Sequence, residues 1–278
     1  MKKNVLFLAI CAATFNSNAQ TVQFKKGQLV TISNSSTQEI DMGMAGQMNN
    51  SSKLTSILEI KEVVKNSYKA IVKVSKLSMS FDAMGEQQTF DSEKEADMQN
   101  EIGKSLGTNI GKEFKIEIDN NTGKVTTEKK ADTTSTAKND NPLEGIMNMT
   151  VSNENNGALA ESIIFVLPTY KKAGDSWQDS SEVKNDARIY KTYTLKSVQD
   201  GMATLGLISK SNGKTTTEAQ GMQIDLMMDI KSDAELLVDT KTSIIKKITR
   251  TINIDGSMEV MGQSLPITAK TTELVEVN

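Results

Sequence analysis

The chain of 278 residues has no histidine, one cysteine, three prolines and only 4% aromatic residues. Without histidine, Ser-His-Asp and Cys-His catalytic arrangements cannot form, because both need an imidazole to move protons near neutral pH. The zinc motif HExxH needs two histidines and is excluded as well. We therefore predict that the protein is not an enzyme, has no catalytic or metal-binding residues, and uses no cofactor.

The N-terminus has the order of a secretory signal peptide. A basic start at Met1–Asn4 precedes an apolar run over Val5–Phe15, and the small residues Ser17 and Ala19 follow. This is the order that a signal peptidase recognises, and the run is shorter than the roughly 20 residues that span a bilayer. We predict a signal peptide over residues 1–19 and a β-rich domain over residues 20–278, exported to the periplasm or secreted.

The partners are limited by charge and by the position of the cysteine. Cys11 lies inside the predicted signal peptide, so the exported chain would have no thiol for disulfides or thiolate metal sites. A net charge of −3 argues against nucleic acid, which binds basic surfaces. No second long apolar run occurs, so no transmembrane helix is expected.

Most of the chain alternates apolar and polar residues with the period of two that is typical of β-strands. Residues 113–118 and 224–238 show the pattern most clearly. The apolar parity changes between Val74 and Leu77, which predicts a β-bulge near Lys76. Turn residues at 119–123, 199–201 and 211–213 predict hairpins and therefore an antiparallel meander.

Two stretches have helical periodicity instead. Ser92 and Glu95 match a capping box, and an apolar stripe follows at Met98, Ile102, Leu106 and Ile110. Asn141–Pro142 predicts a second helix start, with helix continuing past Leu159 toward Pro168. The predicted fold is mainly β (α+β): a large curved antiparallel sheet or half-barrel with two or three covering helices.

Residues 128–141 are polar and read as a loop that divides the domain. The turn at 118–125 resembles the one at 238–245 in its placement of Asp and Thr, so two similar halves are a hypothesis.

Methionine is abundant, with 15 residues, and tryptophan occurs once. Methionines at strand spacing fit three interpretations: core packing, the lining of an apolar ligand site, or a Cu(I) site, for which thioethers are suitable ligands. Trp177 follows a Gly-Asp-Ser turn and is either a packed ring or an aromatic lip over a cavity. The candidate ligand-binding residues are Met42, Met44, Met228, Met258 and Trp177.

Several short features resemble one known family. They are Asn18-Ala19-Gln20, Met84-Gly85-Glu86 leading to Phe90-Asp91-Ser92, Ile118-Asp119 with Gly123-Lys124-Val125, and Leu167-Pro168 followed by Gly174-Asp175-Ser176-Trp177. The sequence is similar to a family of exported bacterial proteins known only as a domain of unknown function. The resemblance implies export and a β-rich fold. The expected architecture is also similar to that of the periplasmic lipoprotein carriers, which hold acyl chains in a concave sheet.

Three functions remain open from the sequence. The favoured one is a non-catalytic exported protein that binds an apolar small molecule or lipid on a concave sheet. The alternative is a structural or protein-binding envelope module with a filled core, whose partner would be an envelope protein. The third and least favoured is an enzyme that uses paired carboxylates, because the aspartates alternate with apolar residues as on a solvated sheet face.

Overall fold

A single antiparallel sheet dominates the computed structural model, which describes residues 20–43, 46–83, 86–100, 103–104, 107, 110–127, 153–182, 188–219, 222–260 and 263–278. The strands of its first half are β1 Leu29–Asp41, β2 Gln47–Val63, β3 Ser67–Ala83, β4 Glu86–Asp91, β5 Glu113–Asp119 and β6 Val125–Thr127. Those of the second half are β7 Ser176–Glu182, β8 Arg188–Gln199, β9 Met202–Ala219, β10 Met222–Asp239, β11 Ile244–Val260 and β12 Gln263–Val277. Two helices are described, α1 Glu95–Gln99 and α4 Asn153–Ser162.

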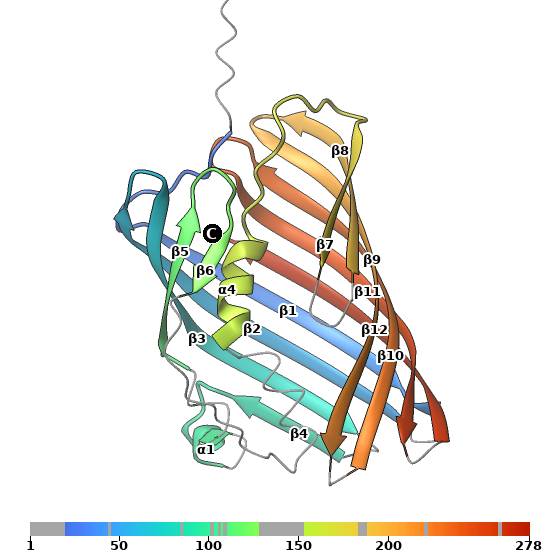
Figure 1. Ribbon diagram of the computed structural model, residues 1–278. Helices are drawn as coiled ribbons and strands as arrows, with labels where there is room; N and C mark the ends of the chain where they lie inside the picture. Colours follow the sequence, from blue (N-terminus) through green and yellow to red (C-terminus); the bar gives the residue numbers. More distant parts are fainter. Residues whose placement is uncertain are drawn as a thin grey trace, which may run out of the picture.

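The strand order is β6-β5-β3-β2-β1-β12-β11-β10-β9-β8-β7, and β4 pairs with the C-terminal part of β3. Chain neighbours are therefore sheet neighbours almost throughout, and the pairing of β1 with β12 joins the two halves at the centre. Figure 1 shows the sheet curving around α4, which lies on its concave side. The predicted mainly β fold with a large curved antiparallel sheet is confirmed. We call the face toward α4 the inner face.

Strand alternation decides which residues reach the inner face. Leu58, Val72 and Leu236 lie on this face and are at most 3% exposed. Ala160 of α4 and Ile163, which directly follows α4, are also buried and belong to the same core. This main core fills one end of the curved sheet, which we call the closed end. The strands continue beyond it for many residues.

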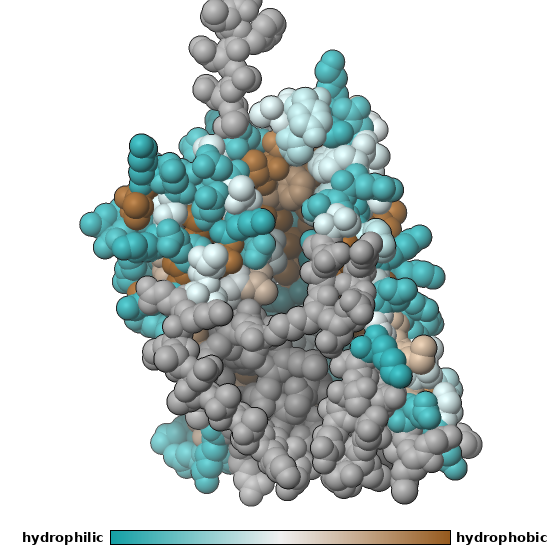
Figure 2. Space-filling view, in the orientation of Figure 1, coloured by the Kyte–Doolittle hydropathy of each residue, from teal (hydrophilic) through white to brown (hydrophobic). Residues whose placement is uncertain are grey.

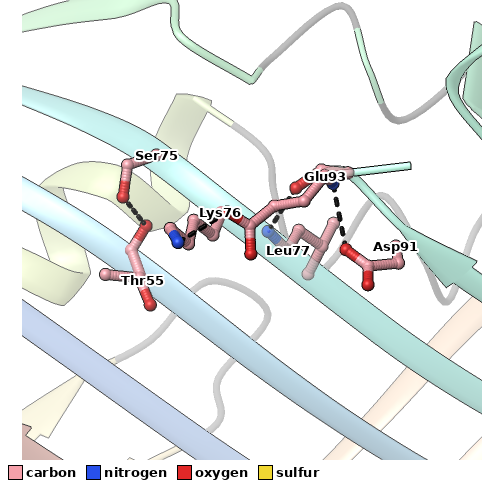
Figure 3. A network of polar contacts seen from close by, with 7 residues as sticks. Thr55, Ser75, Lys76, Leu77, Asp91 and Glu93 are labelled. Atoms are coloured by element: carbon pink, nitrogen blue, oxygen red, sulfur yellow. Dashed lines mark hydrogen bonds and ion pairs between the residues drawn. The ribbon is translucent and has the colours of Figure 1, made fainter. Parts of the chain in front are cut away.

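The bulge predicted near Lys76 is confirmed. Thr55 pairs with Lys76 while Ser56 pairs with Val74, so Ser75 is the extra residue. The Ser75 hydroxyl donates to the Thr55 carbonyl over 3.0 Å, and the Lys76 ammonium lies 2.6 Å from the Glu93 carboxylate (Figure 3). The bulge returns Leu77 to the same buried face as Val74, as the change of parity required.

The capping box expected at Ser92 is wrong. The N-cap of α1 is Lys94, which makes no side-chain capping bond. Ser92 is used by the sheet instead: the Leu77 amide donates to the Ser92 hydroxyl over 2.9 Å, and the Ser92 amide donates to the Leu77 carbonyl. Met98 and Ile110 of the expected stripe pack on a small second core, whereas Ile102 and Leu106 lie outside the described residues.

The hairpins expected at 119–123 and 199–201 are confirmed, but the one at 211–213 is wrong. Strand β9 runs straight through Ser211-Asn212-Gly213, and Gly213 pairs with Met228 without a shift in register. An Asn-Gly pair favours a turn only where the chain can reverse, and here pairing with both β8 and β10 keeps it extended. The predicted loop at 128–141 and the start of the helix expected from Asn141 lie outside the described residues. The described helix in this stretch, α4, ends at Ser162, so the helix does not continue to Pro168 as expected.

The two turns that look alike in sequence also look alike in their hydrogen bonds. The Asp119 carboxylate accepts from the amides of Asn121 and Thr122, and the Asp239 carboxylate accepts from those of Lys241 and Thr242. Hydrogen bonds from Thr122 hold the pKa of Asp119 below its usual 3.8, the backbone amide having the larger effect and the hydroxyl the smaller one. Each turn then takes a positive φ, at Gly123 and at Ser243. A duplication of the whole half stays a hypothesis.

The segment at 20–24 links these turns at the closed end. The Val22 amide donates to the Asn120 carbonyl over 2.8 Å, and the Gln23 amide donates to the Thr242 carbonyl over 3.1 Å. The Tyr68 hydroxyl donates to the Val22 carbonyl, and the Tyr68 ring meets Phe24 edge-on at 5.3 Å. Residues 20–24, which directly follow the predicted signal peptide, therefore pack at the closed end of the sheet.

Candidate functional site: the inner face beyond the core

The inner face changes character along the strands. On β1, the inner residues read Val30, Ile32, Asn34, Ser36, Gln38 and Ile40 from the closed end outward. The neighbouring strands follow the same order of apolar, polar and again apolar residues. The strand register aligns these changes across β2, β1 and β12, so the inner face has a polar zone between two apolar zones there, whereas β3 stays apolar at Leu77, Met79 and Phe81.

We call the polar zone the polar belt. Its residues lie in three adjacent rows across β2, β1, β12, β11, β10 and β9, and Asn34 alone represents the row nearest the closed end. They are half-buried and are Asn34, Ser36, Gln38, Asn50, Ser52, Ser209, Ser232, Arg250, Thr271 and Glu273.

The belt is held together by side-chain hydrogen bonds. Glu273 accepts from the Asn34 amide over 2.8 Å and lies 3.3 Å from the Arg250 guanidinium. In the next row, the Asn50 amide donates to Gln38 over 3.2 Å, and the Gln38 amide donates to the Thr271 hydroxyl over 3.2 Å. Side-chain exposure is 29% for Arg250 and 16% for Glu273, so the pair is only partly open to solvent.

Two belt oxygens lack a donor. The side-chain amide oxygens of Asn34 and Asn50 are shielded from solvent and have no hydrogen-bond partner among the described residues. A buried acceptor without a donor costs about 1–3 kcal/mol, so such groups are rare in a finished interior. The belt is therefore not a fully satisfied network.

Beyond the belt lies a second apolar zone, which we call the distal apolar face. Its side chains come from β1, β2, β10, β11 and β12 and are half-buried rather than buried. They are Ile40, Met48, Met228, Ile230, Ile254, Met258, Leu265, Ile267 and Ala269. The outer neighbours on the same strands are exposed polar or charged residues, among them Glu39, Asp255 and Lys270. The distal segments of these strands are thus amphipathic, although the main core ends before it reaches them.

Two glycines flank a methionine at the centre of the distal apolar face. Met228 pairs with Gly213 on one side and with Gly256 on the other, so no side chain flanks it in its own row. A Cβ at Gly256 would lie 2.3 Å from the Met227 carbonyl oxygen, so only glycine fits there. A flexible methionine between two glycines can adapt its shape to a bound molecule.

The candidate residues from the sequence fall into three groups. Met228 and Met258 are brought together on the distal apolar face, two residues apart in register across β10 and β11. Met42 directly follows β1 and is half-buried, and Met44 lies outside the described residues. Trp177 lies apart from the methionines, at the β7 edge.

Trp177 belongs to an aromatic cluster. Its ring stacks on Tyr193 at 5.5 Å, Tyr193 meets Phe165 at 5.1 Å, and the Lys171 ammonium lies 5.3 Å from the Trp177 ring centre. Burial raises the pKa of Tyr193 above its usual 10.0; nearby Asp179 raises it further and Arg250 opposes this. Trp177 and Tyr193 both pack against the main core.

The sequence analysis did not single out the belt. Its signal was visible as an interruption in the apolar parity, since Ile32 and Ile40 share a face but Asn34, Ser36 and Gln38 separate them. Arg250 and Glu273 interrupt β11 and β12 in the same way. Only the register shows that these interruptions coincide.

Figure 2 shows the described surface hollowed between hydrophilic rims, with apolar residues lining the bottom of the hollow. A shallow depression of about 570 Å³ crosses β3, β2, β1, β12 and β11; it is lined mainly by serine and threonine and includes the belt residues Ser36, Ser52, Arg250 and Glu273. Most of its lining residues, such as Ser35, Thr37 and Ser51, have the outer parity. Its small hydroxyl side chains define no particular chemistry, so we place the candidate site on the inner face.

Neither metal nor membrane-spanning features emerge from the described part of the chain. Within it, no three Cys, Asp or Glu side chains gather as metal ligands would. Its helices are also too short or too polar to cross a bilayer.

The fold and inner face define a protein built on one open, amphipathic, curved antiparallel sheet. The chain belongs to DUF6263, a family of unknown function, whose model matches residues 65–245. This confirms the resemblance to a family known only as a domain of unknown function. No curated protein matches the sequence.

Two solved structures match most of the chain. A structure that describes lipid–protein interactions in lipovitellin has a TM-score of 0.50 and 11% identity, and the match covers 92% of this chain but only 25% of the lipovitellin chain. An outer membrane channel from Pseudomonas putida F1 has 5% identity over 94% of this chain and 98% of the channel, with a TM-score of 0.23. The first likeness supports the curved-sheet architecture; the second is too low to support an argument.

Proposed function

We propose that this protein is a non-catalytic exported protein that binds an apolar small molecule or lipid on the inner face of its sheet. The observation that carries the proposal is the distal apolar face, where amphipathic strands continue past the core with half-buried Ile, Leu and Met side chains. Apolar surface that is arranged in this way on a concave sheet is typical of ligand sites.

The flexible lining supports an apolar ligand rather than a rigid polar one. Met48, Met228 and Met258 adapt to irregular shapes at low cost, and the glycines on both sides of Met228 place no side chain against it. The fold similarity to lipovitellin, whose structure describes lipid–protein interactions, supports the proposal by analogy of architecture. Export follows from the predicted signal peptide over residues 1–19.

Native mass spectrometry of the exported chain, purified without detergent from its own host, tests the proposal. We expect an added mass that is released into organic solvent and identified there as a lipid or another apolar molecule. A bare protein mass would contradict the proposal if the protein also takes up no single-chain lipid added below its aggregation concentration.

A further inference from the structure

The polar belt adds information about the head group of the ligand. It lies between the closed end and the distal apolar face, so a ligand on that face with its head toward the core would place the head at the belt. This inference rests on the proposed lipid binding and goes further, because it concerns which polar groups the lipid has.

The belt has no net charge among its described residues. Arg250 and Glu273 are its charged members, and they pair with each other at 3.3 Å. A charged head group would have to compete with this pair, whereas a neutral head leaves it intact. The belt therefore favours an uncharged head.

The belt also lacks hydrogen-bond donors at defined places. The amide oxygens of Asn34 and Asn50 are shielded acceptors without a donor among the described residues, and they lie two rows apart, since Asn34 pairs with Leu54, four residues from Asn50. The amide nitrogens of these side chains already donate, that of Asn34 to Glu273 and that of Asn50 to Gln38. A ligand hydroxyl can supply the missing donor, whereas an ester or a carboxylate cannot.

We propose that the ligand is a single-chain lipid with an uncharged head that bears hydroxyl groups, as in a monoacylglycerol. One of its hydroxyls donates to the free amide oxygen of Asn50, which is the nearer of the two to the distal apolar face, and its acyl chain lies along Ile40, Ile254 and Met258. Arg250 and Glu273 stay paired beside the head. The same lipid without hydroxyls retains the apolar contacts and loses the belt contacts.

Three lipids with the same acyl chain test this inference: 1-oleoylglycerol, methyl oleate and oleate. They compete for the full exported chain below their aggregation concentrations, and bound masses are compared by native mass spectrometry. We expect 1-oleoylglycerol to bind about tenfold more tightly than methyl oleate or oleate, a factor equivalent to about 1.4 kcal/mol. Equal binding of 1-oleoylglycerol and methyl oleate, or preference for oleate, would overturn the head-group inference and leave the proposed function standing. Failure of all three to bind would overturn both.

A pair of adjacent asparagines supplies the matched variants. Asn50→Leu replaces the belt amide with an apolar group of similar size, while Asn49→Leu makes the same change on the exposed outer face. We expect Asn50→Leu to remove the preference for 1-oleoylglycerol without weakening methyl oleate, and Asn49→Leu to retain it. An unchanged preference in Asn50→Leu, with the same thermal unfolding as Asn49→Leu, would also overturn the inference.

Discussion

Replacing Ile248 with alanine should lower the free energy of unfolding by about 3 kcal/mol, the usual cost of emptying an isoleucine site in a packed core. Ile248 is 1% exposed on the inner face of β11 and belongs to the main core. Its surroundings are fixed by neighbouring strands, so little collapse into the cavity is possible. Urea unfolding followed by circular dichroism measures the loss.

Ile254→Ala is the matched control. Ile254 lies six residues further along the same strand and on the same inner face, but it is half-buried. Because less apolar surface is removed from a partly open site, we expect a loss of about 1 kcal/mol or less. Equal losses at the two positions would show that the distal end is as filled as the core, which is what the alternative of a structural module predicts.

The second large effect is on binding. Ile254→Asp should weaken lipid binding by about 100-fold or more, because a carboxylate without a partner would be covered by the acyl chain. Asn253→Asp introduces the same charge one residue earlier, on the exposed outer face, and should bind lipid as the unaltered protein does. Titration with a fluorescent single-chain lipid measures both. The distal apolar face would not be the binding surface if the two variants bound equally well.

Local sequence pattern was enough to predict the faces of most strands. Alternation at residues 113–118 and 224–238 corresponds to β5 and β10, and the change of parity between Val74 and Leu77 predicted a bulge near Lys76, one residue from the extra Ser75. These predictions succeed because a half-buried strand must alternate, and an extra residue must reverse the alternation.

Long-range pairing was beyond the local pattern. The hydrogen bonds between β1 and β12 join residues such as Ile40 and Ala269, and nothing near either residue indicates the other. The Asn212-Gly213 turn was predicted wrongly for a related reason, since two flanking strands outweigh a local turn preference. Ser92 likewise bonds to Leu77 across the sheet instead of capping a helix.

The candidate site was predicted only in part. Met228 and Met258 were chosen for their abundance and spacing, and the register brings them together on one face. Trp177 was chosen for its rarity, and it packs with Tyr193 instead of joining the methionines. The belt depends on polar residues from six strands meeting in three adjacent rows, which only the register reveals.

Fluorescence quenching by a lipid with a brominated acyl chain tests the central claim most directly. In a Trp177→Phe background, Ile254→Trp places the only tryptophan on the distal apolar face, and Asn253→Trp places it on the outer face of the same strand. Bromine quenches tryptophan only at short range. The account predicts strong, saturable quenching of the tryptophan at position 254 and none at position 253. Equal quenching at both positions, or none at position 254 while lipid is bound, would contradict binding on the inner face of the sheet.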